Sequence, residues 1–429
     1  MRQQASRRSR RGVVLLIAVL VCLVPLVAPP RLVQAQGRPE FVEDELLVQF
    51  KRHVPPANEA AAHGQATAQV VREVPGLDVK VVKVPPQRLA HAFQSYQSNP
   101  NVAYVERNGI AYAGWTPDDS SFGQQWSLNN TGLDGGTADA DIDAPEAWDV
   151  AATANAAATV ISIVDTGFDG QHADLNGKIR EARNWYDGGP TADVYGHGTH
   201  VAGIAAANTN NETGIAGVCP DCGLLNAKVC SDAGSCPYDR IANGVLWSVG
   251  CELRAPDRGP NLGACQGPIR AQVINMSIAG SSPSTTLQKA MDRAADRGAT
   301  MACAAGNAGT TQAMYPAFYS NCIAVAATTN QDQRASFSTY GTWVDVAAPG
   351  ANIYSTLIGG QYGLMSGTSM ASPHVAGLAG LLRSRGIVTT RDAIRSRIES
   401  AADPITGTGS LWAKGRINAC RGMKNAPGC

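Results

Sequence analysis

From residue 158 onward, short apolar runs alternate with segments that have the residue spacing of helices. Continuous apolar runs are typical of strands buried on both faces, so this alternation predicts a parallel sheet with helices packed on both sides. The expected fold is α/β, with a doubly wound and mainly parallel sheet. Strands are expected at residues 160–164, 224–229, 273–277, 300–304 and 323–326.

The chain before this region has a different pattern of apolar residues. Residues 45–50, 79–84 and 101–106 form short strand-like runs, and another alternating stretch lies near Val70. Such short strands, with little enzyme-like chemistry among them, predict a small α+β module. The loop-rich stretch that follows places a domain boundary near Gly114, and it contains an expected helix at residues 144–149.

The N-terminal segment predicts export. Residues 1–35 carry six arginines and no acidic residue, with an apolar run at 12–28. This pattern, with modest or small side chains near Ala35, is that of a cleaved secretory signal peptide. A transmembrane anchor is the alternative, but Pro25 interrupts the run, which is shorter than the roughly 20 residues that a span needs. We therefore expect a secreted protein without a stable membrane anchor.

Charge and cysteine content narrow the function further. Residues 114–429 carry 21 basic and 27 acidic residues, a net charge of −6, which does not favour a nucleic-acid partner. The exported part contains ten cysteines, and an even number in an oxidising compartment predicts disulfides. Sequence alone does not fix their connectivity. Local pairing is the simplest arrangement, joining Cys230 to Cys236, Cys251 to Cys265, Cys303 to Cys322, and Cys420 to Cys429.

Two polar residues stand where strands are expected to end. Asp165 closes the first apolar run in Asp-Thr-Gly, and Asn307 follows the run at 300–304. In open parallel sheets the active site lies beyond the carboxyl ends of the strands, so both are candidates. Each also has an ordinary structural explanation, because aspartate often caps helices or braces loops and asparagine is common in turns.

Ser369 lies among small residues that lead into a helical run. In mid-helix, Pro373 would clash with the carbonyl of Ser369, so the regular helix is expected to begin about there. A serine at a helix N-terminus is exposed and polarised, which suits a nucleophile. Taken alone, it is better explained as a helix N-cap.

A serine nucleophile needs a base, because its hydroxyl is weakly reactive until the proton is removed. Four histidines follow residue 113: His172, His197, His200 and His374. His197 opens a helical run whose small neighbours allow close approach of a partner, whereas His200 is expected to serve packing. An aspartate held rigidly at a strand end can fix the tautomer of such a histidine, and Asp165 meets that condition.

Three segments together resemble the signature segments of the subtilases: Val-Asp-Thr-Gly at 164–167, Gly-His-Gly-Thr-His-Val-Ala-Gly at 196–203, and Gly-Thr-Ser-Met-Ala-Ser-Pro-His at 367–374. Their order, Asp then His then Ser, is that known for subtilisin. The resemblance spans about 115–417 and implies a subtilisin-like fold and serine endopeptidase activity. It implies a triad of Asp165, His197 and Ser369, with Asn307 stabilising the oxyanion.

The resemblance also implies where substrate binds and how the chain matures. The walls of the pocket for the residue before the scissile bond would be Ser277, Ile278 and Ala279 on one side and Ala304, Ala305 and Gly306 on the other. Protein and peptide substrates would add there as an extra strand. Residues 36–113 resemble a propeptide that assists folding and then inhibits, with self-cleavage expected near Ala113. Residues 114–429 would be the peptidase, expected as a monomer.

A structural calcium ion is a further expectation. The stretch at 209–216 resembles the thermitase-like branch, in which this loop and an aspartate after the catalytic acid hold calcium. Asp174 and Asn210 stand at similar places, and oxygen ligands suit calcium. No cofactor is expected for the chemistry itself.

Four other functions compete with this interpretation. An aspartic protease would need a second Asp-Thr-Gly or Asp-Ser-Gly, which the sequence lacks. An α/β-hydrolase would have its serine first in the chain order. A zinc module could use His197, His200, Cys219 and Cys222, but export favours disulfides over thiolates. A catalytically dead binding protein is disfavoured because the triad residues and Asn307 are all present.

Overall fold

The computed structural model describes residues 41–109, 116–150, 152–153, 156–251, 265 and 267–424. The expected signal peptide at 1–35 and the expected cleavage site near Ala113 lie outside the described residues. None of the helices in the described ranges is long and apolar enough to cross a membrane.

Residues 41–109 form a small α+β module, as predicted. Its antiparallel sheet has the strand order β2-β3-β1-β4. Strand β1 alternates, and Leu46 and Val48 are buried against Val82 and Tyr96, so the module has a core of its own. The elements are β1 (Phe41–Phe50), α1 (Pro56–Gln65), β2 (Gln69–Val74), β3 (Val79–Lys83), α2 (Leu89–Gln97) and β4 (Val102–Gly109).

The remaining described residues contain a seven-stranded sheet with the order β11-β10-β9-β8-β5-β7-β6. Every neighbouring pair in this sheet is parallel, which confirms the predicted α/β fold. The strands are β5 (Val160–Asp165), β6 (Ile179–Asn184), β7 (Gly223–Lys228), β8 (Val273–Met276), β9 (Thr300–Ala304), β10 (Cys322–Thr328) and β11 (Val346–Pro349).

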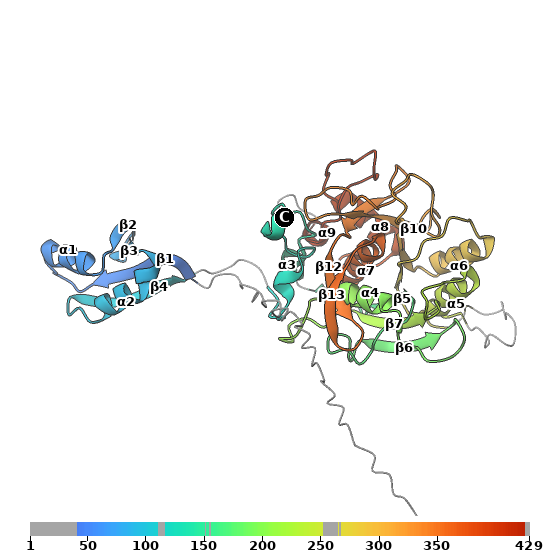
Figure 1. The fold of residues 1–429 in the computed structure, drawn as a ribbon, viewed down its shortest axis with the longest axis horizontal. Helices are drawn as coiled ribbons and strands as arrows, with labels where there is room; N and C mark the ends of the chain where they lie inside the picture. Colours follow the sequence, from blue (N-terminus) through green and yellow to red (C-terminus); the bar gives the residue numbers. More distant parts are fainter. Residues whose placement is uncertain are drawn as a thin grey trace, which may run out of the picture. The chain divides into compact units, whose positions relative to one another are not determined.

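Helices cover both faces of this sheet. Consecutive strand residues enter different cores: Ile163 belongs to the cluster that contains Val201 and Val375, and Val164 to the cluster that contains Ile241 and Leu287. On the second face α5 and α6 lie side by side (Figure 1). The helices are α3 (Ala144–Trp148), α4 (His197–Ala206), α5 (Tyr238–Ser248), α6 (Thr285–Asp296), α7 (Thr368–Ser384), α8 (Arg391–Ala401) and α9 (Ala419–Lys424).

A two-stranded hairpin, β12 (Ile353–Leu357) with β13 (Gln361–Met365), stands outside the main sheet and leads into α7. It braces α4, because the Ser355 hydroxyl donates to the His200 carbonyl at 2.8 Å and the Thr356 hydroxyl donates to the Thr199 carbonyl at 2.8 Å. The hairpin therefore connects the helix that begins at His197 with the helix that contains Ser369.

Four disulfides join cysteines in the described residues. Three are the local pairs predicted from sequence, Cys230–Cys236, Cys251–Cys265 and Cys303–Cys322. The fourth, Cys219–Cys222, removes the thiolates that a zinc module would use. The predicted Cys420–Cys429 pair includes Cys429, which lies outside the described residues.

Candidate active site

Asp165 and His197 form a hydrogen-bonded pair at the carboxyl end of the central strand β5. Asp165 is the last residue of β5, and His197 is the first residue of α4. Asp165 Oδ1 lies 2.7 Å from His197 Nδ1 and also accepts a hydrogen bond from the Thr166 amide at 2.7 Å. The Asp165 side chain is 1% exposed and that of His197 is 22% exposed. The pair thus has a buried acid and a histidine that solvent can reach.

The electrostatics of the pair make His197 more basic. Burial alone would lower its pKa, but the charge of Asp165, the hydrogen bond that this carboxylate accepts from His197 and the charge of Asp193 together raise the pKa above 6.5. The opposite shift occurs at His200 and His374, because burial lowers the pKa of each to about 4. Among these three histidines, only His197 can take up a proton near neutral pH.

Sequence reasoning missed Asp193, which fixes the start of α4. Its carboxylate is buried and accepts hydrogen bonds from the amides of Gly196 (2.9 Å) and Thr199 (2.9 Å). It also accepts from the Thr166 hydroxyl at 2.9 Å, and that hydroxyl accepts from the Gly198 amide. Aspartate is a common residue at the start of a helix, where it accepts hydrogen bonds from the free amides. Nothing in the sequence indicates that Asp193 also contacts Thr166, the residue after Asp165.

Ser369 is the second residue of α7, as the position of Pro373 predicted. Because proline has no N–H, the helix cannot supply the usual donor to the Ser369 carbonyl. The Ser277 hydroxyl donates to that carbonyl instead, at 2.7 Å. The Ser369 hydroxyl donates to the Ser277 carbonyl at 3.1 Å, and within the described residues it makes no hydrogen bond to His197.

Asn307 lies where two N–H donors converge. Its Oδ1 accepts from the Thr368 amide (2.9 Å) and the Thr368 hydroxyl (2.9 Å), which fixes the orientation of the side-chain amide. A carbon built on Gly367 as a Cβ would lie 3.3 Å from Asn307 Nδ2 and 3.5 Å from the Ser369 amide nitrogen. Both nitrogens therefore border a single point beside Ser369.

The six predicted pocket residues follow two neighbouring strands. Ser277, Ile278 and Ala279 come after β8, whereas Ala304, Ala305 and Gly306 end or follow β9, and β8 pairs with β9 in parallel. The two segments therefore leave the sheet side by side. Beyond them the chain is pinned by an antiparallel bridge in which Gly280 and Tyr315 exchange two backbone hydrogen bonds of 2.8 Å.

The candidate calcium residues Asp174 and Asn210 lie in a region rich in oxygen atoms. Asp174 is fully buried, and its carboxylate accepts from the Asn211 side chain at 3.0 Å and from the Ile215 amide at 2.8 Å. The backbone amide of Asn210 donates to Asp119 at 2.9 Å, and the Asn210 side-chain oxygen accepts from the Asp118 amide at 3.1 Å. Burial, with the charge of Asp174 adding to it, raises the pKa of Asp119 to about 6. Sequence reasoning missed Asp119, whose other oxygen is buried without a partner among the described residues.

No group of three or more His, Cys, Asp or Glu side chains in the described residues is arranged to hold a metal ion. A calcium ion near Asp119 and Asp174 would therefore take other oxygens, such as backbone carbonyls or side-chain amides, among its ligands. The unpartnered Asp119 oxygen fits such a hard cation.

Comparison with known proteins shows which family the chain resembles. The subtilase family profile matches residues 156–418, and the profile of the fervidolysin N-terminal prodomain matches residues 28–108. The chain is 39% identical over 381 residues to the thermophilic serine proteinase of Bacillus sp. strain AK1, an alignment that covers 88% of this chain and 87% of that protein. It is 46% identical over 284 residues to thermitase of Thermoactinomyces vulgaris, covering 66% of this chain and 94% of that protein.

Solved structures agree with these matches. A protease from Pseudoalteromonas arctica PAMC 21717 superposes with a TM-score of 0.62 at 31% identity, covering 73% of this chain and all of that one. The fold and these similarities define a subtilisin-like serine protease with an N-terminal prodomain. The chain belongs to the subtilase family, whose members need no cofactor for catalysis.

Proposed function

We propose that Asp165, His197 and Ser369 act as a catalytic triad in a secreted endopeptidase. The observation that carries the proposal is the 2.7 Å contact between Asp165 Oδ1 and His197 Nδ1. With Nδ1 engaged by a buried carboxylate, His197 presents Nε2 as the base and gains stabilisation as an imidazolium. Hydrogen bonds between nucleophile and base are often formed only with substrate bound, so the present acceptor of Ser369, the Ser277 carbonyl, is compatible with this role.

In the proposed reaction, Ser369 Oγ gives its proton to His197 Nε2 while it attacks the peptide carbonyl. The oxyanion that forms accepts hydrogen bonds from Asn307 Nδ2 and the Ser369 amide, the two donors that converge beside Gly367. His197 then protonates the leaving amine, and water hydrolyses the acyl-enzyme by the reverse use of the same groups. The segments that begin at Ser277 and end at Gly306 would hold the substrate as an added strand.

We propose that residues 36–113 are a propeptide that inhibits the peptidase of residues 114–429 until Ser369 cleaves near Ala113. The match of residues 28–108 to a prodomain profile supports the inhibitor role. Residues 1–35 would direct secretion, and the mature enzyme would act as a monomer on protein and peptide substrates. Calcium would bind near Asp119 and Asp174, where it would stabilise the loop without entering the chemistry.

Two measurements on purified protein test the proposal. A fluorophosphonate should label the parent at Ser369 and leave the Ser369→Ala variant unlabelled, with loss of peptidase activity. The variant should also accumulate as an uncleaved precursor. Labelling at another residue, or normal activity in the variant, would refute the triad. Normal trimming of the purified variant would refute self-processing while leaving the triad intact.

A further inference from the structure

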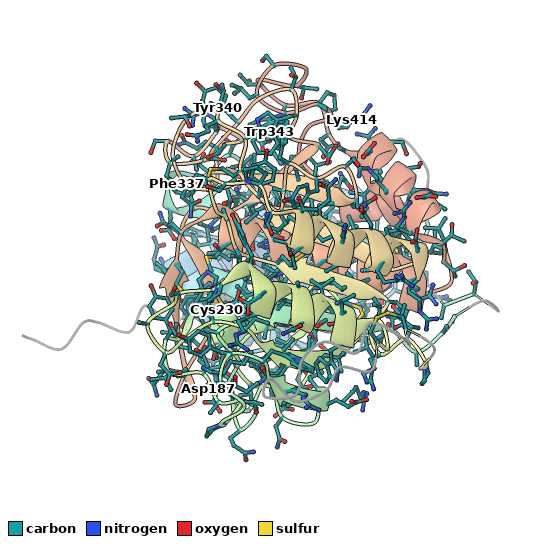
Figure 2. All side chains as sticks on the ribbon, turned by 90° about the vertical axis from the view of Figure 1, so that its right-hand side faces the viewer. Asp187, Cys230, Phe337, Tyr340, Trp343 and Lys414 are labelled. Carbon is teal, nitrogen blue, oxygen red and sulfur yellow. A yellow bond between two sulfur atoms is a disulfide. The ribbon has the colours of Figure 1, made fainter. Side chains whose placement is uncertain are left out.

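A disulfide-closed loop follows the strand next to Asp165. Cys230 and Cys236 lie six residues apart, just after β7, and Cys230 is labelled in Figure 2. The loop is tied internally, because the Ser231 amide donates to the Ser235 carbonyl at 2.8 Å and the Ser235 amide donates to the Ser231 hydroxyl at 3.1 Å. Loop residues 231–236 are thus held as one compact unit.

The loop is joined directly to the residue that bears the candidate acid. The amides of Val229 and Cys230 both donate to the backbone carbonyl of Asp165, at 2.9 and 3.3 Å. One half of the disulfide is therefore hydrogen-bonded to Asp165 itself. Cys230 is fully buried. A shift of its backbone would therefore displace the Asp165 carbonyl to which its amide donates.

Lys228 provides a second connection. Its side chain is 4% exposed, and its ammonium donates to the carbonyls of Thr166 (2.8 Å) and Ala192 (3.2 Å) and to the carboxylate of Asp232 (2.8 Å). Thr166 follows Asp165, Ala192 precedes Asp193, and Asp232 belongs to the disulfide loop. A single buried cation thus ties the loop to the two segments that orient His197.

Tyr195 provides the third connection, on the histidine side. Its ring lies so close to Gly234, in the disulfide loop, that a Cβ built on Gly234 would come within 2.8 Å of the ring. Its amide donates to Asp193 at 3.1 Å, and it stands two residues before His197. Tyr195 is nevertheless 56% exposed, so its contact with the loop leaves much of the residue open to solvent.

We propose that the Cys230–Cys236 loop is a positioning element for the Asp165–His197 pair, a role that rests on the proposed triad. The disulfide fixes the loop, and the loop fixes Asp165 through Cys230, the Thr166 and Ala192 backbone through Lys228, and the approach to His197 through Tyr195. Loss of the disulfide loosens all three connections at once. The consequence is a poorer Asp165–His197 contact, which lowers turnover and makes His197 less basic.

The test compares two disulfide deletions in the purified mature enzyme. Cys230→Ala/Cys236→Ala removes the positioning disulfide, and Cys251→Ala/Cys265→Ala removes another short-loop disulfide. In the part of the chain that the structure describes, no hydrogen bond joins Cys251 or Cys265 to Asp165 or His197. The first variant should lose about tenfold or more in kcat, since misplacement of about 1 Å costs on the order of 100-fold. Its KM should change little, and the acid limb of its pH profile should move to lower pH. The control should keep kcat within about twofold.

A parental kcat and pH profile in the first variant, with only its thermal stability lowered, would overturn the positioning role. If that variant fails to fold, Asp232→Ala is tested in its place. This substitution removes the ion pair between Lys228 and the loop and leaves the disulfide intact. A parental kcat in Asp232→Ala would then count against the proposal. Fluorophosphonate labelling of the parent separates the two hypotheses, since an unlabelled parent refutes the triad, whereas a labelled parent with an equally fast variant refutes only the positioning.

Discussion

Ser277 and Ser369 exchange two hydrogen bonds: the Ser277 hydroxyl donates to the Ser369 carbonyl at 2.7 Å, and the Ser369 hydroxyl donates to the Ser277 carbonyl at 3.1 Å. The first bond satisfies the carbonyl that Pro373 leaves without a helical donor. The second holds the candidate nucleophile against the segment that would bind substrate. The candidate pocket wall at Ser277 and the candidate nucleophile Ser369 are therefore a single hydrogen-bonded unit.

Ser277→Ala should destabilise the protein by breaking this unit. It leaves the Ser369 carbonyl without its donor and the buried side chain of Asn275 without the Ser277 acceptor that it uses at 2.9 Å. An unsatisfied buried polar group costs about 1–3 kcal/mol. Urea unfolding in the Ser369→Ala background, which avoids self-digestion, measures the loss, and Ser281→Ala in the exposed loop nearby serves as the control. Equal stability in the two variants would show that the bond contributes nothing.

Two substitutions at Asn307 separate donation to the oxyanion from support of Thr368. Asn307→Ala removes both, whereas Asn307→Asp keeps an oxygen for Thr368 and removes the Nδ2 donor. Both should lower kcat by about 100- to 1,000-fold with little change in KM, the range measured for the oxyanion asparagine of subtilisin. Steady-state kinetics on a peptide substrate decides. Near-parental kcat in the aspartate variant alone would make Asn307 a support for Thr368.

The pH dependence of activity should reflect the raised pKa of His197. His197 must be neutral to accept a proton, so kcat/KM should fall as the pH drops through a value above 6.5. Asp193→Asn removes one of the charges that raise this pKa, so the acid limb should move to lower pH. Asp187→Asn, in the exposed part of the same loop, is the control (Asp187 is labelled in Figure 2). An unmoved limb in Asp193→Asn would exclude the charge of Asp193 as a cause.

Removal of calcium should lower the thermal stability of the Ser369→Ala chain. A ligand present at 100 times its Kd stabilises the folded state by about 2.7 kcal/mol, and a chelator removes that contribution. Asp174→Asn and Asp119→Asn should each reduce the drop in Tm caused by the chelator, whereas Asp187→Asn should leave it unchanged. Calorimetry with and without chelator makes the comparison. A chelator effect of the same size in all of these variants would place calcium elsewhere or nowhere.

The sequence predicts the central part of the sheet well, because strands buried on both faces are apolar throughout. It does not predict β6, whose residues Arg180, Glu181 and Arg183 are exposed at the edge of the sheet and carry no apolar pattern. The strand β11 is not predicted either, because its two alanines and its proline are residues that strands disfavour.

Prediction of the site has a similar limit. Asp165 could be singled out because it ends an apolar run, and Ser369 because Pro373 limits where the helix begins. The contact of Asp193 with Thr166 and the partner of the Ser369 hydroxyl depend on tertiary packing. Neither can be predicted from the residues next to them in the sequence. The hydrogen bond from the Asn211 side chain to Asp174 has the same origin, because the folded loop decides which of its side chains reach that carboxylate.

The bare Cα of Gly367 has a consequence for how this chain can be inactivated. Its backbone is nearly extended, with φ 164° and ψ 160°, a conformation that alanine adopts without strain. A methyl group there would stand beside Asn307 Nδ2 and the Ser369 amide, where it would occupy the space needed by the reacting oxygen. We therefore expect Gly367→Ala to fold with Asn307 displaced by a few tenths of an ångström, and to lose activity because the added carbon stands where the proposed oxyanion would form. At this position the missing side chain leaves the space that the proposed reaction needs.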